Sequence, residues 1–110
     1  KTSRDFCFIE NAVQANILAA TSDLSSRNEV YNVAVGDRTD LTTLYSILKS
    51  VLIENGRDVT SSFMHLEFRK GDVLHSQASI QKATDKLGYV PAYDVFAGVK
   101  KAIHWYIEKL

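Results

Sequence analysis

The chain has 110 residues, the size of one domain, and a chain of that length buries roughly 60 to 70% of its unfolded surface. Apolar residues make up 45% and charged residues 24%, which is the composition of an ordinary globular protein. The 13 Lys and Arg side chains equal the 13 Asp and Glu side chains, so no basic field exists to attract nucleic acid or an anionic membrane. We therefore expect neither partner, and any anion-binding site must be local.

Cysteine usage and the ends of the chain suggest where the protein works. The single cysteine, Cys7, cannot form an internal disulfide, which favours a reducing compartment. No apolar run approaches the ~20 residues of a membrane-spanning helix, and no signal peptide opens the chain. We therefore expect a cytoplasmic protein. Because Lys1 is not a methionine and the next residues read like mid-chain sequence, we also expect a fragment of a longer protein.

The first third of the chain predicts a helix and a strand. Residues 6–9 fit either a short strand or the entry to a helix. Apolar residues at helical spacing then predict a helix over residues 10–20. A β-branched run over residues 30–35, ended by Gly36, predicts a buried strand because it is short and sharply bounded.

The middle of the chain carries the strongest helical pattern. Apolar residues at helical spacing predict a helix over residues 41–52, with Thr39 or Asp40 as its N-terminal cap. The helix should end near residues 55–56, where a polar connection begins. An apparent strand follows over residues 63–68.

The last third predicts two further helices. Residues 78–87 should form a short helix stopped by a left-handed Gly88, and Asp94 can cap a final helix with one apolar face. A few strands with about four helices make a small α/β lobe. Because so few strands cannot cover every apolar helical face, we expect some of that surface to contact a partner domain and the isolated chain to self-associate.

The stretch over residues 68–76 holds the residue types of half a nucleotide site. Gly71 lets the backbone turn sharply or come close to a ligand. Arg69 offers a planar fork of donors that suits a phosphate, and Asp72 offers acceptors that suit a pair of sugar hydroxyls. If the fold brings Arg4 near Arg69, two guanidinium groups can hold one diphosphate. Otherwise they are two ordinary surface arginines.

Other candidate chemistry is weaker. Cys7 is better explained as a small buried thiol than as a nucleophile. Tyr45 and Lys49 have the Tyr-x-x-x-Lys spacing of a dehydrogenase base, but no glycine-rich dinucleotide fingerprint accompanies them, so we interpret the pair as packing. The three histidines have no metal-ligand spacing, and we predict no metal site: His65, His75 and His104.

Four segments together resemble extended short-chain dehydrogenase/reductases. An R-D-F segment lies within residues 2–11, and pieces in the same order as in that family follow at residues 30–36, 68–73 and 86–91. The whole chain resembles the C-terminal, substrate-binding part of a nucleoside-diphosphate-sugar epimerase, in particular bacterial UDP-N-acetylglucosamine 4-epimerases of surface-polysaccharide pathways.

The resemblance implies a role for each of five residues. It implies that Arg4 and Arg69 bind the diphosphate of UDP, that Asp72 binds the uridine ribose and that Phe6 lines the same pocket. The alternative for Arg4 is a structural ion pair with its neighbour. Ser76 matches a gatekeeper beside the 2-position of the sugar, where a small side chain implies a UDP-N-acetylhexosamine. Its alternative is a polar residue entering the next helix.

The resemblance also implies what these residues do not supply. Residues 1–110 would be the UDP-sugar-binding domain of a larger NAD-dependent isomerase, with no catalytic or NAD-binding residue of their own, because those residues belong to the family's N-terminal domain. The fragment alone should be inactive, and the full-length enzyme should be a homodimer. Two alternatives stay open: the lobe of a UDP-N-acetylglucosaminuronic acid 4-epimerase or related dehydratase, and a free-standing protein-interaction module.

Overall fold

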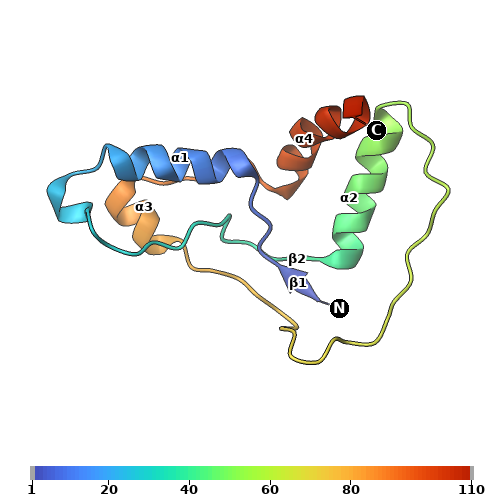
Figure 1. The fold of residues 1–110 in the computed structure, drawn as a ribbon, viewed down its shortest axis with the longest axis horizontal. Helices are drawn as coiled ribbons and strands as arrows, with labels where there is room; N and C mark the ends of the chain where they lie inside the picture. Colours follow the sequence, from blue (N-terminus) through green and yellow to red (C-terminus); the bar gives the residue numbers. More distant parts are fainter. Residues whose placement is uncertain (1, 110) are drawn as a thin grey trace.

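The computed structural model describes residues 2–109 as an elongated molecule with extents of 53 × 35 × 19 Å (Figure 1). Four α-helices, one short 3₁₀ helix and two very short strands make up its regular structure within that range, which confirms the predicted small lobe of a few strands and about four helices. In chain order they are β1 (Ser3–Arg4), α1 (Ile9–Ala20), η1 (Leu24–Ser26), β2 (Thr39–Asp40), α2 (Leu41–Glu54), α3 (Gln81–Leu87) and α4 (Val95–Lys109).

The two longest helices, α2 and α4, begin at the predicted caps. The Asp40 carboxylate accepts a hydrogen bond from the Thr43 backbone N–H at 2.6 Å and so caps α2. Asp94 does the same for α4, with 2.8 Å between its Oδ1 and the Ala97 nitrogen. Each carboxylate satisfies one of the N–H groups that a helix start leaves without an intrahelical partner. The predictions for both helix starts are therefore confirmed.

The other two helices differ slightly from the prediction. Residues 6–8 are irregular and α1 begins at Ile9, so this segment is a helix entry rather than a strand. α3 is shorter than predicted, because it begins at Gln81 instead of residue 78. Its end is as predicted: Gly88 has a φ of 71°, a left-handed conformation that glycine adopts without a steric cost.

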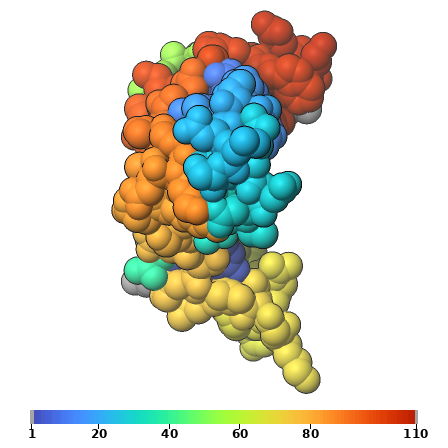
Figure 2. Space-filling model, turned by 90° about the vertical axis from the view of Figure 1, so that its left-hand side faces the viewer, coloured from blue at the N-terminus to red at the C-terminus, as the bar shows by residue number. Residues whose placement is uncertain are grey.

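The two predicted strands are wrong. Neither residues 30–35 nor residues 63–68 form a strand. The two strands that do form have two residues each and pair antiparallel, with Ser3 opposite Asp40 and Arg4 opposite Thr39. A β-branched run becomes a strand only if another backbone segment lies beside it. Residues 63–68 are all exposed, and the segment around them projects from one end of the molecule (yellow in Figure 2).

The core consists of two separate helix contacts (Figure 1). At one end α1 packs against α3 around the buried Ala15, Ala83 and Tyr89. At the other end α2 packs against α4, where Val51 and Ile103 are buried. The segment between α2 and α3 runs around the outside of the molecule, and the strands lie beside the start of α2. No helix within residues 2–109 is long and apolar enough to cross a bilayer.

Candidate functional site

A cleft of about 540 Å³ lies beside the two short strands. Its walls come from the N-terminal segment, the first residue of α2 and the projecting segment over residues 64–72. It is lined by Thr2, Arg4, Phe6, Leu41, Met64, Leu66, Glu67, Phe68, Arg69 and Asp72. The structure thus brings together four of the five residues that the sequence singled out for ligand binding, although the N-terminal pair lies more than sixty positions from the other pair.

Asp72 is the centre of the charged end of this cleft. Its Oδ1 accepts a hydrogen bond from Arg4 Nη2 at 2.8 Å, and its Oδ2 accepts one from Arg69 Nη2 at 3.0 Å. The Val73 backbone N–H also donates to Oδ1, at 2.8 Å. This N–H and the Arg69 guanidinium lower the pKa of the Asp72 carboxyl from its usual value. The carboxylate is therefore ionised at neutral pH, and both arginines contact the same group.

A tight turn presents Arg69 and Asp72 on the same side of the chain. The Asp72 N–H donates to the Arg69 carbonyl at 3.1 Å, and Gly71 within the turn has a φ of 82°. An L side chain rarely adopts that conformation, so the glycine is needed for the turn rather than for space. Of the two roles that the sequence suggested for Gly71, a sharp turn or a close approach to a ligand, the backbone geometry supports the turn.

Three distant segments meet at β1. Ser3 pairs with β2, and it also donates its N–H to the Leu74 carbonyl at 2.9 Å and accepts from the Ser76 N–H at 3.1 Å. This network ties the turn that carries Asp72 to the strand that carries Arg4. Ser76, the predicted gatekeeper, uses its backbone here; its side chain is exposed, and it is not one of the residues that line the cleft.

Sequence reasoning missed two residues that support the site. The Asp5 carboxylate accepts from the Val35 and Gly36 N–H groups, both at 2.9 Å, and thereby fixes the chain directly after Arg4. Arg4 itself pairs with Asp72. Arg4 and Asp5 therefore bond to different distant segments, and this replaces the alternative of a local ion pair between them. Ser3 Oγ lies 2.6 Å from His75 Nδ1. Nothing in the sequence pattern indicates this contact.

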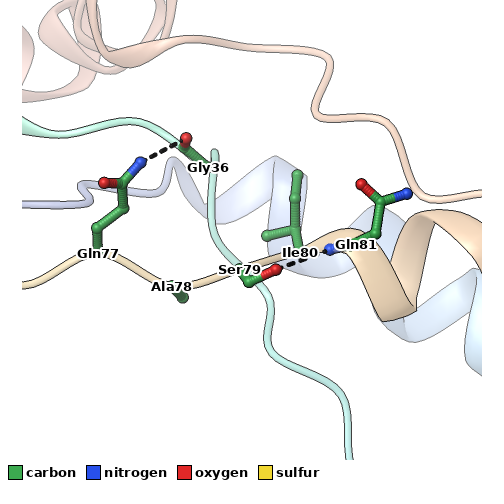
Figure 3. Close-up of a pocket in the computed structure, with 6 residues that line it drawn as sticks. All are labelled: Gly36, Gln77, Ala78, Ser79, Ile80 and Gln81. Atoms are coloured by element: carbon green, nitrogen blue, oxygen red, sulfur yellow. Dashed lines mark hydrogen bonds between the residues drawn. The ribbon is translucent and has the colours of Figure 1, made fainter.

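A second, open concavity of about 450 Å³ lies where α3 begins (Figure 3). Its lining is mostly polar, and the Gln77 side-chain amide donates to the Gly36 carbonyl at 2.8 Å across it. Ser79 Oγ accepts from the Gln81 backbone N–H at 3.5 Å. None of the five predicted ligand-binding residues lines this concavity, and its polar groups bond to one another.

The weaker candidates behave as packing residues. The Tyr45 hydroxyl donates to the Ser61 carbonyl, and its ring packs edge to face against Phe63 with 5.0 Å between ring centroids. Burial is the largest cause that raises the pKa of the Cys7 thiol, the opposite of what activates a nucleophile. Residues 2–109 contain no group of three or more His, Cys, Asp or Glu residues placed to hold a metal ion.

Comparison with known proteins finds similarity between this chain and one part of several nucleotide-sugar enzymes. A UDP-N-acetylglucosamine 4-epimerase from Methanobrevibacter ruminantium, solved with UDP-N-acetylmuramic acid, is 33% identical with a TM-score of 0.83, over 99% of this chain and 33% of that one. This chain resembles one part of UDP-sugar 4-epimerases. The UDP-glucose 4-epimerase of Thermotoga maritima, solved with UDP-glucose, is 28% identical with a TM-score of 0.84, over 98% of this chain and 32% of that one.

The curated relatives give the same match. UDP-glucuronate 4-epimerase 5 of Arabidopsis thaliana is 30% identical over 116 residues, which cover 96% of this chain and 26% of that protein. The chain spans 30% of the length of the curated relatives that head the comparison. No protein-family model matches the chain. The similarity therefore covers nearly all of this chain but only about a third of an epimerase.

Proposed function

We propose that this chain is the substrate-binding lobe of an NAD-dependent UDP-sugar 4-epimerase and that its cleft holds the UDP part of the substrate. The observation that supports this most is the meeting of Arg4, Arg69, Asp72 and Phe6 on one cleft, in a chain similar to one part of UDP-sugar 4-epimerases. A zero net charge supplies no general attraction for anions, so a local pair of arginines is what a diphosphate would require.

In this proposal the lobe positions the substrate and makes no bond. Arg4 and Arg69 supply positive charge to the diphosphate, and Asp72 accepts hydrogen bonds from the ribose hydroxyls. Phe6 gives an apolar wall to the same cleft. Holding UDP still while the sugar ring reorients contributes to rate through orientation rather than through proton transfer.

NAD does not fit the residues described here. Binding of a dinucleotide pyrophosphate requires a strand, a glycine-rich turn and a helix in succession. β1 is followed by Asp5 and Phe6, and β2 leads directly into α2 with no glycine between them. We therefore assign no NAD contact and no catalytic residue to this chain; both would come from another part of the enzyme, whose predicted dimeric state is also part of this proposal.

In this proposal the sugar is an N-acetylhexosamine, because the resemblance implies that Ser76 is the gatekeeper and a small side chain there would leave room for an acetamido group. Ser76 lies outside the lining of the cleft, which in this proposal holds the UDP part rather than the sugar. The alternative is a uronic acid, and the similarity to a UDP-glucuronate 4-epimerase keeps that alternative in view. In the enzyme that contains this lobe, Ser76→Tyr should lower kcat/KM for UDP-N-acetylglucosamine much more than for UDP-glucose. Equal losses for the two sugars would contradict the gatekeeper role.

Calorimetric titration of the chain with UDP at low salt tests the binding role. We expect measurable binding that Arg69→Ala removes and that Arg27→Ala preserves, because Arg27 is exposed and bonds only within its own loop. UDP binding that is insensitive to Arg69→Ala would refute the site. If the chain alone does not bind UDP, the same variants in the full-length enzyme decide the matter, and an unchanged KM for UDP-sugar in Arg4→Ala and Arg69→Ala would then refute it.

A further inference from the structure

The two arginines on Asp72 are held in different ways. Arg4 donates through Nη1 to the carbonyls of Ser3, at 2.7 Å, and of Leu74, at 3.4 Å, in addition to its bond to Asp72. Its side chain is 29% exposed. The Arg69 side chain bonds to Asp72 Oδ2, its one partner within residues 2–109, and is 85% exposed. One guanidinium is therefore part of the framework, and the other is attached at a single point.

The backbone around Arg4 strengthens this asymmetry. Ser3, on one side, is buried and bonded to the Leu74 and Ser76 backbone. Asp5, on the other side, accepts from two backbone N–H groups of the 35–36 turn. Moving the Arg4 guanidinium would break its bonds to Asp72 and to the carbonyls of Ser3 and Leu74. Moving the Arg69 guanidinium would break one exposed ion pair, and such a pair contributes little because solvent screens it.

Asp72 shows the same division between its two oxygens. Oδ1 accepts from both Arg4 and the Val73 N–H, whereas Oδ2 accepts from Arg69, its one partner within residues 2–109. A phosphate group offers Arg69 the same planar, two-point acceptor geometry as a carboxylate, with more negative charge. If Arg69 transferred to a phosphate, Asp72 Oδ2 would become available to accept from a ligand hydroxyl while Oδ1 kept its position.

We propose that Arg69 is an exchangeable clasp that leaves the Asp72 carboxylate for a ligand phosphate, while Arg4 stays bonded to Asp72 as a positioning residue. This inference rests on the proposed function and refines it, because the resemblance gives the two arginines equal roles at the diphosphate. In this proposal the Asp72 carboxylate is the anion that Arg69 contacts in the ligand-free chain. On binding, a phosphate of the ligand replaces that carboxylate as the partner of Arg69.

Inorganic pyrophosphate is the probe that tests the exchange, because it presents the anion without sugar or base. Asp72→Asn should tighten pyrophosphate binding in calorimetry, since it weakens the internal competitor. Glu67→Gln is the matched control: it removes the same charge from the same cleft. We expect Asp72→Asn to raise the affinity for pyrophosphate about two- to fivefold more than Glu67→Gln does. This is the range that the loss of an exposed ion pair supports.

The combination with Arg69→Ala identifies which arginine moves. When Arg69→Ala is also present, Asp72→Asn and Glu67→Gln should change the affinity for pyrophosphate equally. A larger effect of Asp72→Asn that persists there means that Arg4 is the exchanging residue and overturns the proposal, as does an equal effect of Asp72→Asn and Glu67→Gln in the unchanged background.

Nuclear magnetic resonance of the arginine Nε–Hε groups gives a second test that needs no Asp72 variant. On addition of pyrophosphate the Arg69 signal should shift strongly, and the Arg4 signal should stay nearly in place. A larger shift at Arg4 overturns the exchange. If UDP binding depends on Arg69, but neither the larger effect of Asp72→Asn nor the selective Arg69 shift is seen, the exchange is refuted and the proposed function stands. If UDP binding is independent of Arg69, both are refuted.

Discussion

Gly98 on α4 lies directly against the Phe8 side chain. A Cβ at this position would lie 2.7 Å from Phe8 Cβ and 3.0 Å from Phe8 Cγ, closer than real Cβ atoms approach. We expect Gly98→Ala to lower the free energy of unfolding by about 1 to 3 kcal/mol, the usual cost of overpacking, although alanine favours a helix more than glycine does. Urea unfolding followed by circular dichroism measures the change.

The control for Gly98→Ala is its combination with Phe8→Gly, which removes the Phe8 Cβ that alanine would keep. Because the clash involves the Phe8 side chain, the double variant should lose less stability than the sum of the single variants. Strict additivity would show that the helix, rather than the contact with Phe8, determines the cost.

Tyr89 gives the chain an alkaline limit. Its side chain is fully buried, and its hydroxyl donates to the Ala34 carbonyl at 2.7 Å. Burial, which disfavours the phenolate, raises the pKa of Tyr89 from its ordinary 10.0 to about 12. A raised pKa in the folded state means that the stabilisation is fully present below pH 10 and is lost as the pH rises from 10 towards 12.

The loss of stability from Tyr89 should reach about 2 to 3 kcal/mol once both states are deprotonated, since one pKa unit corresponds to about 1.4 kcal/mol. Unfolding measured across this range should show it. Tyr89→Phe should remove most of the pH dependence, and an unchanged alkaline slope in that variant would refute the assignment.

At the scale of single residues, the sequence predicted which side chains would gather at one cleft better than how they contact one another. Residue types alone left two ordinary surface arginines as the alternative, and Arg4, Arg69 and Asp72 were singled out because their segments resemble motifs of a known family. That the two arginines share Asp72 depends on the backbone of β1 and of the 69–72 turn, and no local pattern encodes a contact between positions so far apart. The supporting role of Asp5 was missed for the same reason, since its partners lie at residues 35–36.

Among the elements, α4 depends on its cap. Asp94 accepts from the Ala97 N–H at 2.8 Å at the start of this 15-residue helix. Asp94→Ala should lower the free energy of unfolding by about 1 kcal/mol, the typical loss of a cap, as measured by thermal or urea unfolding. Asp94→Asn is the matched control, because asparagine caps nearly as well. Equal losses in the two variants would point to charge rather than to the cap.

The helices were predictable and the strands were not, for a physical reason. Helical hydrogen bonds join near neighbours, so apolar spacing and a cap such as Asp40 predicted α2 correctly. A strand is stabilised by a second segment, and the runs over residues 30–35 and 63–68 could not reveal that none lies beside them in the described chain. The two real strands have two residues each, too short for an alternating pattern.

At the scale of the whole molecule, large apolar side chains are left uncovered. Ile9, Val13 and Ile17 form an exposed row along α1, with 67%, 47% and 60% of their surface accessible, and Trp105 on α4 is 59% exposed. Soluble monomers rarely expose apolar patches of this kind. We therefore expect the chain to self-associate in sedimentation experiments and to bind a hydrophobic dye, and Ile17→Lys to reduce both effects.

The alternative outcome also has a clear meaning. A monodisperse monomer that binds no dye would contradict the expected self-association. The same exposed surface also fits the second candidate function, a free-standing interaction module. It would favour that module over a lobe covered by another domain if the natural reading frame began near Lys1, and not otherwise. A dinucleotide-binding domain encoded directly before Lys1 would rule that module out.

The junction of Ser3 with Asp40 and His75 has a consequence for the order of folding. Ser3 and His75 are 72 positions apart, so their contact requires the closure of a long loop, and loop closure has an entropic cost that helix formation avoids. We expect helical circular dichroism to recover early in refolding and the Arg4–Asp72 contact to form late. The chain would then become compact and helical before it can recognise a ligand.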